Sequence, residues 1–415
     1  MKLITFLGTG RYDATEYAWQ GKTKITQFAP VASCAFAQAT EAVVFITAEA
    51  EAVHGQALRD LLNIPVSFVS VPKGENEAEL WQIFSAIARS VVPGEEVVFD
   101  VTHGLRSFPL IGLLAAAFLR AGLKIDLKAI YYGAYDVRDQ SVVPHRTPMF
   151  DLIPMAALLE WATAADRFSR TGDARYFASM LRSQQKTMAV QAQGNYDELS
   201  KIGSIGTLAS ALTDISQSLG LIRPHLAMQQ VARLPEKVEQ ALPTLAKAEA
   251  TLPFRLLLNS MLESYQALAL KEPAQDVQKD LEIERALIVW YAEREHWAQA
   301  VSLSREWLVS WVMFHLGLNN LTVLSDRHRI EGVVNAEAAE FLKSKDQQKE
   351  FVPVFLKSLA QLDTVLGLWK ALTDVRNDID HAGMRENPGK PEDLVKQINK
   401  HILAIQNLPI QYSGT

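Results

Sequence analysis

The chain of 415 residues is longer than one hydrophobic core usually organises, so we expect two or three domains. Its 41 Lys and Arg against 47 Asp and Glu give a net charge of −6, which argues against general electrostatic binding to nucleic acid but leaves room for a local basic groove. The single cysteine, Cys34, excludes an intrachain disulfide framework and any cysteine-rich zinc or iron–sulfur site, and it fits a reducing compartment.

The first 150 residues alternate between short apolar runs and amphipathic stretches. The expected strands are Leu3–Leu7, Val43–Thr47, Val66–Val71, Val97–Val101 and Leu127–Tyr132. The expected helices are Pro30–Ala39, Ala50–Leu62, Glu77–Val91 and Phe108–Ala121. Apolar strands separated by helices are typical of a parallel sheet covered on both faces, and Tyr17–Phe28 adds a small hairpin. The sequence therefore predicts an α/β domain over residues 1–150.

The apolar segments of this domain predict no membrane insertion. The first apolar run meets Gly8 after a few residues, so we expect no signal peptide. The longest run, Phe108–Leu119, ends at Arg120 and is shorter than the roughly 20 residues that a membrane span needs. We expect a soluble, cytoplasmic protein with no membrane partner.

After Asp151 the strand pattern gives way to amphipathic helices interrupted by proline and glycine. The polar segment Leu270–Gln275, which contains Pro273, indicates a boundary. We therefore expect a helical connector over residues 151–280, in which no functional motif is evident, and a helical C-terminal domain over residues 281–415. A short basic cluster, Asp326–Arg329, is expected in a solvated loop, with contact to RNA phosphates as the alternative.

The first predicted strand ends in residues that suit a bound anion. It leads into Gly8, Thr9, Gly10, Arg11 and Tyr12. The glycines allow close backbone approach, and the threonine and arginine side chains can donate to phosphate oxygens. The dinucleotide-binding fingerprint requires a third glycine where Asp13 stands, which argues against a hydride-transfer cofactor. A tight turn explains the two glycines equally well.

The fourth predicted strand ends in a second polar loop that leads into a helix. Its candidate ligand-binding residues are Thr102, His103, Gly104, Arg106 and Ser107. Free N–H groups and the helix dipole attract anions there, although Thr102 or Ser107 could simply cap the helix and Asp100 could hold the loop. Ligands bind beyond the carboxyl ends of parallel strands, so both loops are expected to face one ligand. The end of the fifth strand, Tyr131–Ala134, is a further candidate, and a plain turn explains it equally well.

The sequence Asp-Val-Thr-His-Gly at residues 100–104, with Leu-Gly-Thr-Gly-Arg-Tyr at residues 7–12, resembles the CRISPR-associated DxTHG proteins. The resemblance covers residues 1–150 and implies a CARF domain, a Rossmann-like sensor of cyclic oligoadenylates. It implies that the two glycine-containing loops contact the ligand. In that family two domains pair with one ring across the two-fold axis, so a homodimer or higher even oligomer is implied. Cyclic tetra-adenylate is the activator we expect.

Arg376 and His381 lie near the end of a helix that is expected to begin at Phe351 and to include Phe355. Five positions are about 140° apart on a helix, so the two side chains share a cleft only if the last turn bends. Two structural alternatives stay open: His381 could complement the helix dipole, and Arg376 could form an ordinary surface pair with Asp380.

The segment Arg-Asn-Asp-Ile-Asp-His at residues 376–381 resembles the signature of HEPN ribonucleases, over about residues 280–400. The resemblance implies that Arg376, Asn377 and His381 are catalytic and that two copies share one cleft. RNA can be cut without a metal when its own 2′-OH attacks the neighbouring phosphorus. Histidine can then move the proton, arginine can stabilise the phosphoryl charge, and asparagine can orient either group.

Two functions follow from these motifs. The first is a cyclic-oligoadenylate-activated, metal-independent endoribonuclease for single-stranded RNA in a type III CRISPR system. Slow cleavage of the ring by Thr9, His103 and Ser107 is a possible addition. The second is a non-catalytic sensor of a nucleotide second messenger that acts through its helical region, which the net charge and the acidic Asp378 and Asp380 favour. We expect no metal and no cofactor besides the activator, because the other histidines match no metal-ligand spacing: His54, His145, His225, His296, His315, His328 and His401.

Overall fold

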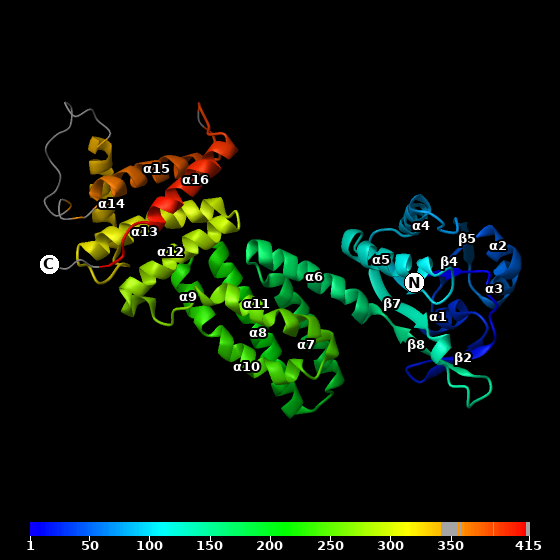
Figure 1. Ribbon diagram of the computed structural model, residues 1–415. Helices are drawn as coiled ribbons and strands as arrows, with labels where there is room; N and C mark the ends of the chain where they lie inside the picture. Colours follow the sequence, from blue (N-terminus) through cyan, green and yellow to red (C-terminus); the bar gives the residue numbers. More distant parts are fainter. Residues whose placement is uncertain (342–355, 357–358, 360, 385, 412–415) are drawn as a thin grey trace. The chain divides into compact units, whose positions relative to one another are not determined.

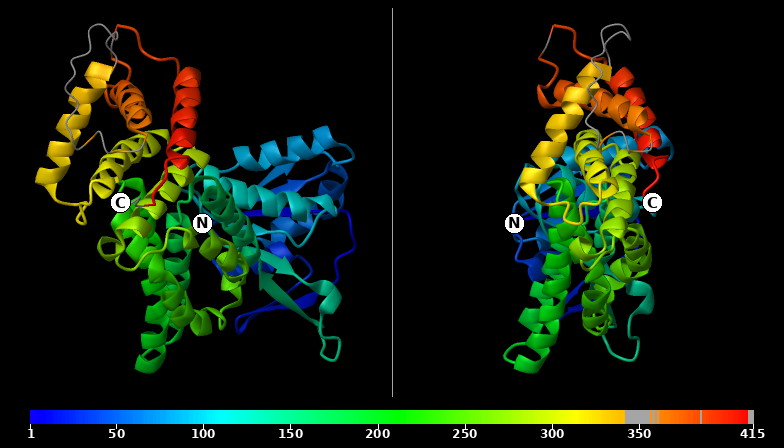
Figure 2. Two further views of the ribbon diagram at one scale, coloured as in Figure 1. Left: turned by 60° about the vertical axis from the view of Figure 1, so that its left-hand side comes forward. Right: turned by 90° about the vertical axis from the view of Figure 1, so that its left-hand side faces the viewer.

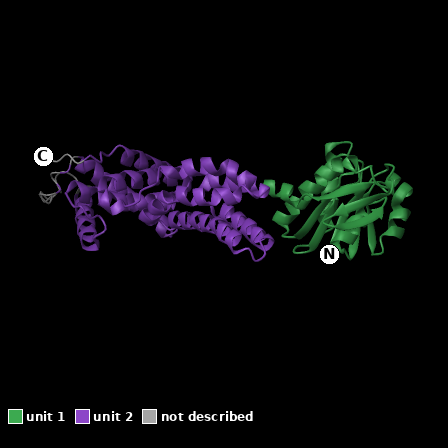
Figure 3. Ribbon diagram, turned by 90° about the horizontal axis from the view of Figure 1, so that it is seen from below, with its two compact units in different colours: residues 1–160 green, residues 161–415 purple. Residues whose placement is uncertain are grey.

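The computed structural model describes residues 1–341, 356, 359, 361–384 and 386–411. The chain forms two compact units, Met1–Glu160 and Trp161–Thr415 (Figure 3). The first unit is a sheet with helices on both faces, and the second unit is helical throughout its described part. The expected fold class, an α/β domain followed by an all-helical region, is confirmed. The expected division of the helical region near residue 280 stays a prediction.

The first unit is built on an eight-stranded sheet of order β3-β2-β8-β7-β6-β1-β4-β5 (Figures 1 and 2). The five strands expected from the sequence are all present: β1 Lys2–Leu7, β4 Glu41–Ile46, β5 Val66–Ser70, β6 Glu96–Asp100 and β7 Asp126–Gly133. They pair in parallel, and β1 lies between β4 and β6. The carboxyl ends of β1 and β6 are therefore neighbours at one edge of the sheet.

Helices cover both faces of this sheet because its strands are apolar on both sides. In β1, Leu3 and Leu7 pack into one hydrophobic cluster, and Ile4 and Phe6 pack into another. The first cluster includes residues of α1 Ala29–Ala37, α2 Ala48–Ala50 and α3 Gln56–Leu61. The π-helical turn η1 Glu51–Gly55 connects α2 to α3. The second includes α4 Glu77–Arg89 and α5 Ser107–Gly122.

The expected hairpin is present, and one further strand escaped the sequence analysis. The hairpin is β2 Thr15–Trp19 and β3 Lys22–Thr26, which turn at Gln20 and Gly21. The additional strand, β8 Arg146–Asp151, follows the short helix η2 Tyr135–Val137, and it pairs antiparallel with β7 and parallel with β2. Its polar ends and central Pro148 lack the continuous apolar pattern of the other strands.

The second unit is a helical array around a hydrophobic cluster that includes residues from Trp161 to Ile410. Its first half contains α6 Ile153–Thr171, α7 Arg175–Gln191, α8 Tyr196–Gly220, α9 Pro224–Ala232, α10 Leu234–Leu245, η3 Glu249–Thr251 and α11 Leu252–Gln266. The short helix η4 Pro273–Gln275 falls in the expected boundary segment. Its second half contains α12 Val277–Glu293, α13 Trp297–His315, α14 Leu324–Phe341, α15 Leu362–Asp380 and α16 Pro391–Gln406.

The structure bears on two expectations for the C-terminal helices, which concern the start of α15 and the first turns of α14. The helix that carries Arg376 begins at Leu362 in the described part of the chain, and Phe351 and Phe355 lie outside the described residues. The expected loop over Asp326–Arg329 is wrong, because this cluster lies in the first turns of α14. There Arg327 donates hydrogen bonds to Ser310, to the Leu321 carbonyl and to Glu306, so partners within the fold hold its charge.

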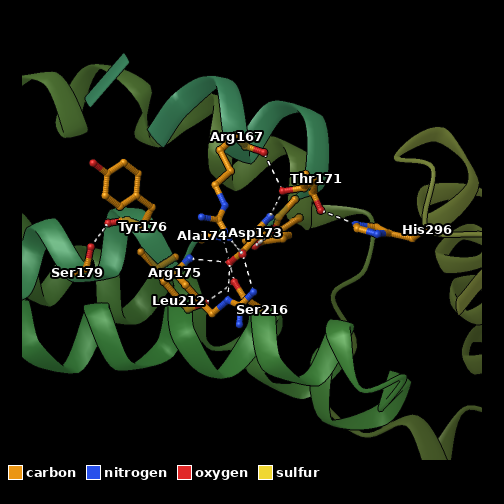
Figure 4. A network of polar contacts seen from close by, with 12 residues as sticks. Arg167, Thr171, Asp173, Ala174, Arg175, Tyr176, Ser179, Leu212, Ser216 and His296 are labelled. Carbon is orange, nitrogen blue, oxygen red and sulfur yellow. Dashed lines mark hydrogen bonds and ion pairs between the residues drawn. The ribbon is translucent and has the colours of Figure 1, made fainter. Parts of the chain in front are cut away.

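A polar network joins α6, α7, α8 and the start of α13 within the second unit (Figure 4). The Asp173 carboxylate accepts hydrogen bonds from Arg167 and Arg175, and the main-chain N–H of Ala174 donates to Ser216. Burial opposes ionisation of Asp173, but the hydrogen bonds and charge of Arg175 and the charge of Arg167 lower its pKa to about 2. The network therefore holds a stable carboxylate at the junction of these helices.

No helix in the described part of the chain combines the length and apolar character that crossing a membrane requires.

Candidate functional site

The two loops predicted to bind a ligand pack directly against each other. β1 and β6 are parallel neighbours, so the residues that follow them, Gly8 and Gly104, meet beyond the strand ends. A Cβ atom on Gly8 would lie 3.3 Å from the main chain of Gly104. Gly104 has a φ of +116°, and a Cβ there would lie 3.0 Å from the ring of Phe108. Glycine at both positions therefore allows the loops to approach and the second loop to turn.

Asp100 holds the second loop in place through hydrogen bonds. It is completely buried, and its Oδ1 atom accepts hydrogen bonds from the N–H of Thr102 at 3.0 Å and its hydroxyl at 2.6 Å. Its Oδ2 atom accepts one from the Thr5 hydroxyl at 3.0 Å. Burial raises the pKa of Asp100 to about 6, although these hydrogen bonds act in the opposite direction. The Thr102 hydroxyl also accepts the Gly133 N–H at 2.8 Å, which connects the loop to the end of β7.

His103 is likewise engaged within the fold. Its Nε2 atom accepts a hydrogen bond of 2.9 Å from the N–H of Ala29, the first residue of α1. Burial and the nearby His54 lower the pKa of His103 to about 3, so the ring is neutral and its proton sits on Nδ1. His103 therefore anchors α1 to the second loop, and only its ring face and Nδ1 remain for a ligand.

An aromatic cluster holds the first loop in place. The Tyr12 hydroxyl accepts the Gly8 N–H at 3.1 Å, and its ring centroid lies 4.1 Å from that of His103 and 5.0 Å from that of His54. The Nε2 atom of His54 forms a 2.8 Å hydrogen bond with the Gly10 carbonyl. The sequence analysis named His54 only among the histidines without metal-ligand spacing, because it lies in η1 and belongs to no motif.

These elements enclose a cleft of about 220 Å³ at the carboxyl edge of the sheet. Of the predicted ligand-binding residues, Arg11, Tyr12, Thr102 and His103 line it. The predicted end of the fifth strand contributes Tyr132 and Gly133. Four further residues line the cleft that the sequence did not single out: Tyr17, Gln27, Tyr135 and Asp136. Asp13, which argues against the dinucleotide-binding fingerprint, also lines it.

The other predicted residues surround the cleft without lining it. Thr9, Gly10 and Arg106 are exposed, and Ser107 is the half-buried first residue of α5. Arg11 extends into solvent, with its Nε atom 3.2 Å from Asp13. The cleft therefore has a mixed charge, with Arg11 and the N-terminus of α5 as its sources of positive potential.

The helix that begins at this cleft also carries an exposed apolar surface. Trp81 and Phe84 of α4, with Leu110, Leu114 and Phe118 of α5, form what we call the α4–α5 apolar face. Trp81 is 65% exposed, Leu110 61% and Phe118 57%. A groove of about 720 Å³ runs between the two helices. An apolar patch of this kind commonly marks a protein-binding surface.

The predicted catalytic residues lie at the C-terminal end of α15. Arg376 is half-buried, and its Nε atom lies 2.9 Å from Asp380, as in the surface-pair alternative. Asn377 and His381 are exposed, and His381 is the C-cap residue. Gly383, with a φ of +68°, ends the helix and donates its N–H to the Asp378 carbonyl at 2.9 Å. The helix end thus presents an arginine, an amide and an imidazole to solvent.

Comparison with known proteins identifies one part of the chain. Residues 157–269 match the family described as CRISPR-associated protein MJ1674, second domain. The CRISPR-associated protein MJ1674 of Methanocaldococcus jannaschii is 30% identical over 123 residues, which is 29% of this chain. The chain spans about a fifth of that curated relative, since the match covers 19% of its length.

The family match covers the region that the sequence analysis interpreted as a connector. It extends over α6 to α11, and it includes neither the two glycine-containing loops nor Arg376 and His381. The CRISPR association that the motifs predict is supported by this match. The CARF and HEPN assignments stay predictions.

Proposed function

We propose that the protein is a cyclic-oligoadenylate-activated, metal-independent endoribonuclease that cuts single-stranded RNA as a homodimer in a type III CRISPR system. The observation that supports this most strongly is the convergence of the loops after β1 and β6 on one cleft, where Arg11, Tyr12, Thr102 and His103 meet. The CRISPR-associated match of residues 157–269 supports the part of the proposal that concerns CRISPR.

The size of the cleft favours a ligand that is shared between two copies. A volume of about 220 Å³ is below the roughly 300–1,000 Å³ typical of ligand pockets, so the cleft suits a part of a cyclic oligoadenylate. A two-fold interface brings the same surface of both copies together, so a dimer through the α4–α5 apolar face would bring two α5 helices together. Each α5 begins next to its own ligand loop. A symmetric ring is the ligand that fits such an arrangement.

The proposed chemistry uses the exposed end of α15. The 2′-OH of RNA attacks the adjacent phosphorus, a 2′,3′-cyclic phosphate forms and the bond from phosphorus to the 5′-oxygen breaks. His381 of one copy accepts the proton of the 2′-OH, and His381 of the other copy donates a proton to the leaving 5′-oxygen, while Arg376 stabilises charge on the phosphoryl oxygens. Asn377 orients the histidine or the phosphate. Because Arg376 is paired with Asp380, a scissile phosphate must compete with that carboxylate. Activator binding favours cutting only if the cutting-competent arrangement binds the activator more tightly than the resting one.

The direct test is to incubate the purified protein with labelled single-stranded RNA, a chelator and a panel of cyclic oligoadenylates. We expect cutting that depends on one ring size and persists in chelator. His381→Ala should abolish cutting while activator binding stays unchanged. His328→Ala, which removes an exposed histidine on α14, is the control and should cut normally. Cutting by His381→Ala at the wild-type rate would show that the catalytic assignment is wrong.

The ion pair between Arg376 and Asp380 favours a second candidate, a non-catalytic sensor of a nucleotide second messenger. In that case the helical region passes the signal to a partner, and the end of α15 has a structural role. The same experiment separates the two functions. Activator binding without RNA cutting, under every ring size tested, supports the sensor.

Slow cleavage of the bound ring is an additional proposed activity. His103 is poorly suited to proton transfer there, because its Nε2 atom is engaged by Ala29 and its pKa is lowered to about 3. Thr9 and Ser107 are left to position the ring for attack by its own 2′-OH. Chromatography of cyclic tetra-adenylate after incubation, with Thr9→Ala and Ser107→Ala variants, tests this activity.

A further inference from the structure

Three potential metal ligands meet in the second unit, away from any motif in the sequence. Asp280 and Glu284 lie one turn apart on α12, and His225 lies in the first turn of α9. The Nε2 atom of His225 is 2.8 Å from Oδ2 of Asp280 and 3.7 Å from Oε1 of Glu284. One ligand atom from each residue lies within 4.8 Å of the others.

Burial makes this cluster unusual. Asp280 is 4% exposed and Glu284 is 8% exposed, so two carboxyl groups share an environment with little water. The Oδ1 atom of Asp280 is buried and has no hydrogen-bond partner among the described residues. A buried polar atom without a partner is costly, and an ion can supply the missing interaction.

The surrounding charges do not neutralise both carboxylates. Burial and the charge of Asp280 raise the pKa of Glu284, so this pocket disfavours a second carboxylate charge. The hydrogen bond from His225 to Asp280 raises the pKa of the imidazole. Arg327 of α14 adds positive potential, but its hydrogen bonds go to Ser310, Leu321 and Glu306, and Glu306 of α13 adds negative potential.

We propose that His225, Asp280 and Glu284 bind one divalent transition-metal ion, with zinc the best match. Imidazole nitrogen and carboxylate oxygen bind zinc at about 2.0–2.2 Å, which places neighbouring ligand atoms of a tetrahedral site about 3.4 Å apart. The observed separations of 2.8 and 3.7 Å lie on either side of that value. The partly exposed ring of His225 leaves an entry route and a fourth position for water.

Such an ion would connect α9, inside the segment that matches the CRISPR-associated family, to α12, which follows it. The site is independent of the proposed RNA cutting, because neither Arg376 nor His381 contributes a ligand.

The test uses Co²⁺ as a spectroscopic probe of the full-length, metal-stripped protein. We expect visible absorption bands that saturate at one Co²⁺ per chain and disappear when Zn²⁺ is added. His225→Gln and Glu284→Gln should weaken binding by at least about tenfold. Glu282→Gln is the matched control, because Glu282 lies on the same helix, is half-buried outside the cluster and pairs with Lys279.

A stability measurement separates loss of the site from loss of the fold. Glutamine has nearly the shape of Glu284 and carries no charge to bury, so Glu284→Gln should unfold at the wild-type temperature or above it without metal. Zn²⁺ should raise the unfolding temperature of the wild type and of Glu282→Gln, but not that of Glu284→Gln. Absence of Co²⁺ binding by the wild type at about millimolar concentration, or unchanged binding by both His225→Gln and Glu284→Gln, would overturn the proposal.

Discussion

Asp100 makes the stability of the first unit depend on pH. Its ordinary pKa is 3.8, and burial raises the folded-state value to about 6, so the folded protein holds this proton more tightly than the unfolded chain. The stabilising effect of that proton is complete below about pH 4 and is lost as the pH rises through about 6. At neutral pH the ionised Asp100 therefore destabilises the folded state, and the hydrogen bonds from Thr5 and Thr102 reduce this destabilisation.

Asp100→Asn tests this directly, because asparagine imitates the protonated carboxyl group. Its amide can accept from Thr102 and donate to Thr5. Between about pH 4 and 7, we expect the free energy of unfolding of the wild type to fall by about 2–3 kcal/mol relative to the variant. Denaturant titrations over a pH series measure both proteins. Parallel curves for the two would contradict the raised pKa.

At this scale the sequence predicted which residues meet, but not which of their atoms face a ligand. Thr102 and His103, which were selected from the motif at residues 100–104, both line the cleft. The hydroxyl of Thr102 nevertheless forms hydrogen bonds with Asp100 and Gly133, and Nε2 of His103 forms one with Ala29. These partners come from distant parts of the chain, so no local pattern could reveal them. The proximity of His225 to Asp280 and Glu284 was not predictable either, because these residues too are distant in the sequence.

At the scale of elements, we expect the α4–α5 apolar face to form the interface of the proposed dimer. Phe118→Asp and Leu114→Asp should shift the protein toward monomer, because a carboxylate buried in an apolar interface costs about 2 kcal/mol or more. Light scattering coupled to size-exclusion chromatography, over a range of protein concentrations, measures the shift. Val53→Asp changes a residue that is 62% exposed and outside this face, so it should leave the association unchanged. A dimer that withstands both α5 variants must use another surface.

Asp173 is expected to stabilise the junction of α6, α7 and α8. Asp173→Asn weakens its hydrogen bonds from Arg167 and Arg175, which should lower the free energy of unfolding by about 1–2 kcal/mol at neutral pH after allowance for solvent screening. The lowered pKa of Asp173 means that this stabilisation is present above about pH 4 and is lost as the pH falls toward 2. Thermal unfolding of the wild type and the variant at pH 7 and at pH 3 measures the difference, which should be smaller at the lower pH.

Elements with a strong local pattern were predictable, and those fixed by tertiary pairing were not. The five apolar strands and the helices between them follow from burial on both faces of a parallel sheet. β8 is stabilised by pairing with β7 and β2, and its own sequence has no apolar run. The helical start at Leu324 was missed for a similar reason, since Arg327 is stabilised by partners on α13 and in the preceding loop.

At the scale of the whole molecule, the proposed function requires that activator binding and RNA cutting depend on each other. Arg11→Ala and Arg106→Ala should raise the activator concentration needed for half-maximal cutting by about tenfold or more, with little change in the maximal rate, because they remove charge at the ligand and not at the RNA. Arg170→Ala, which removes an exposed cation on α6, should leave both quantities unchanged. Equal loss of maximal rate in all three variants would point to general damage to RNA binding instead.

The contact between Gly8 and Gly104 limits how this protein can diverge. The two positions are 96 residues apart in the chain, yet a Cβ atom on Gly8 would lie 3.3 Å from the main chain of Gly104. A Cβ atom on Gly104 would lie 3.0 Å from the ring of Phe108 and 3.2 Å from Cβ of Phe6, so a larger residue at either position requires its neighbours to shift. We therefore expect a substitution at either glycine to be tolerated only together with changes in the groups that it would meet.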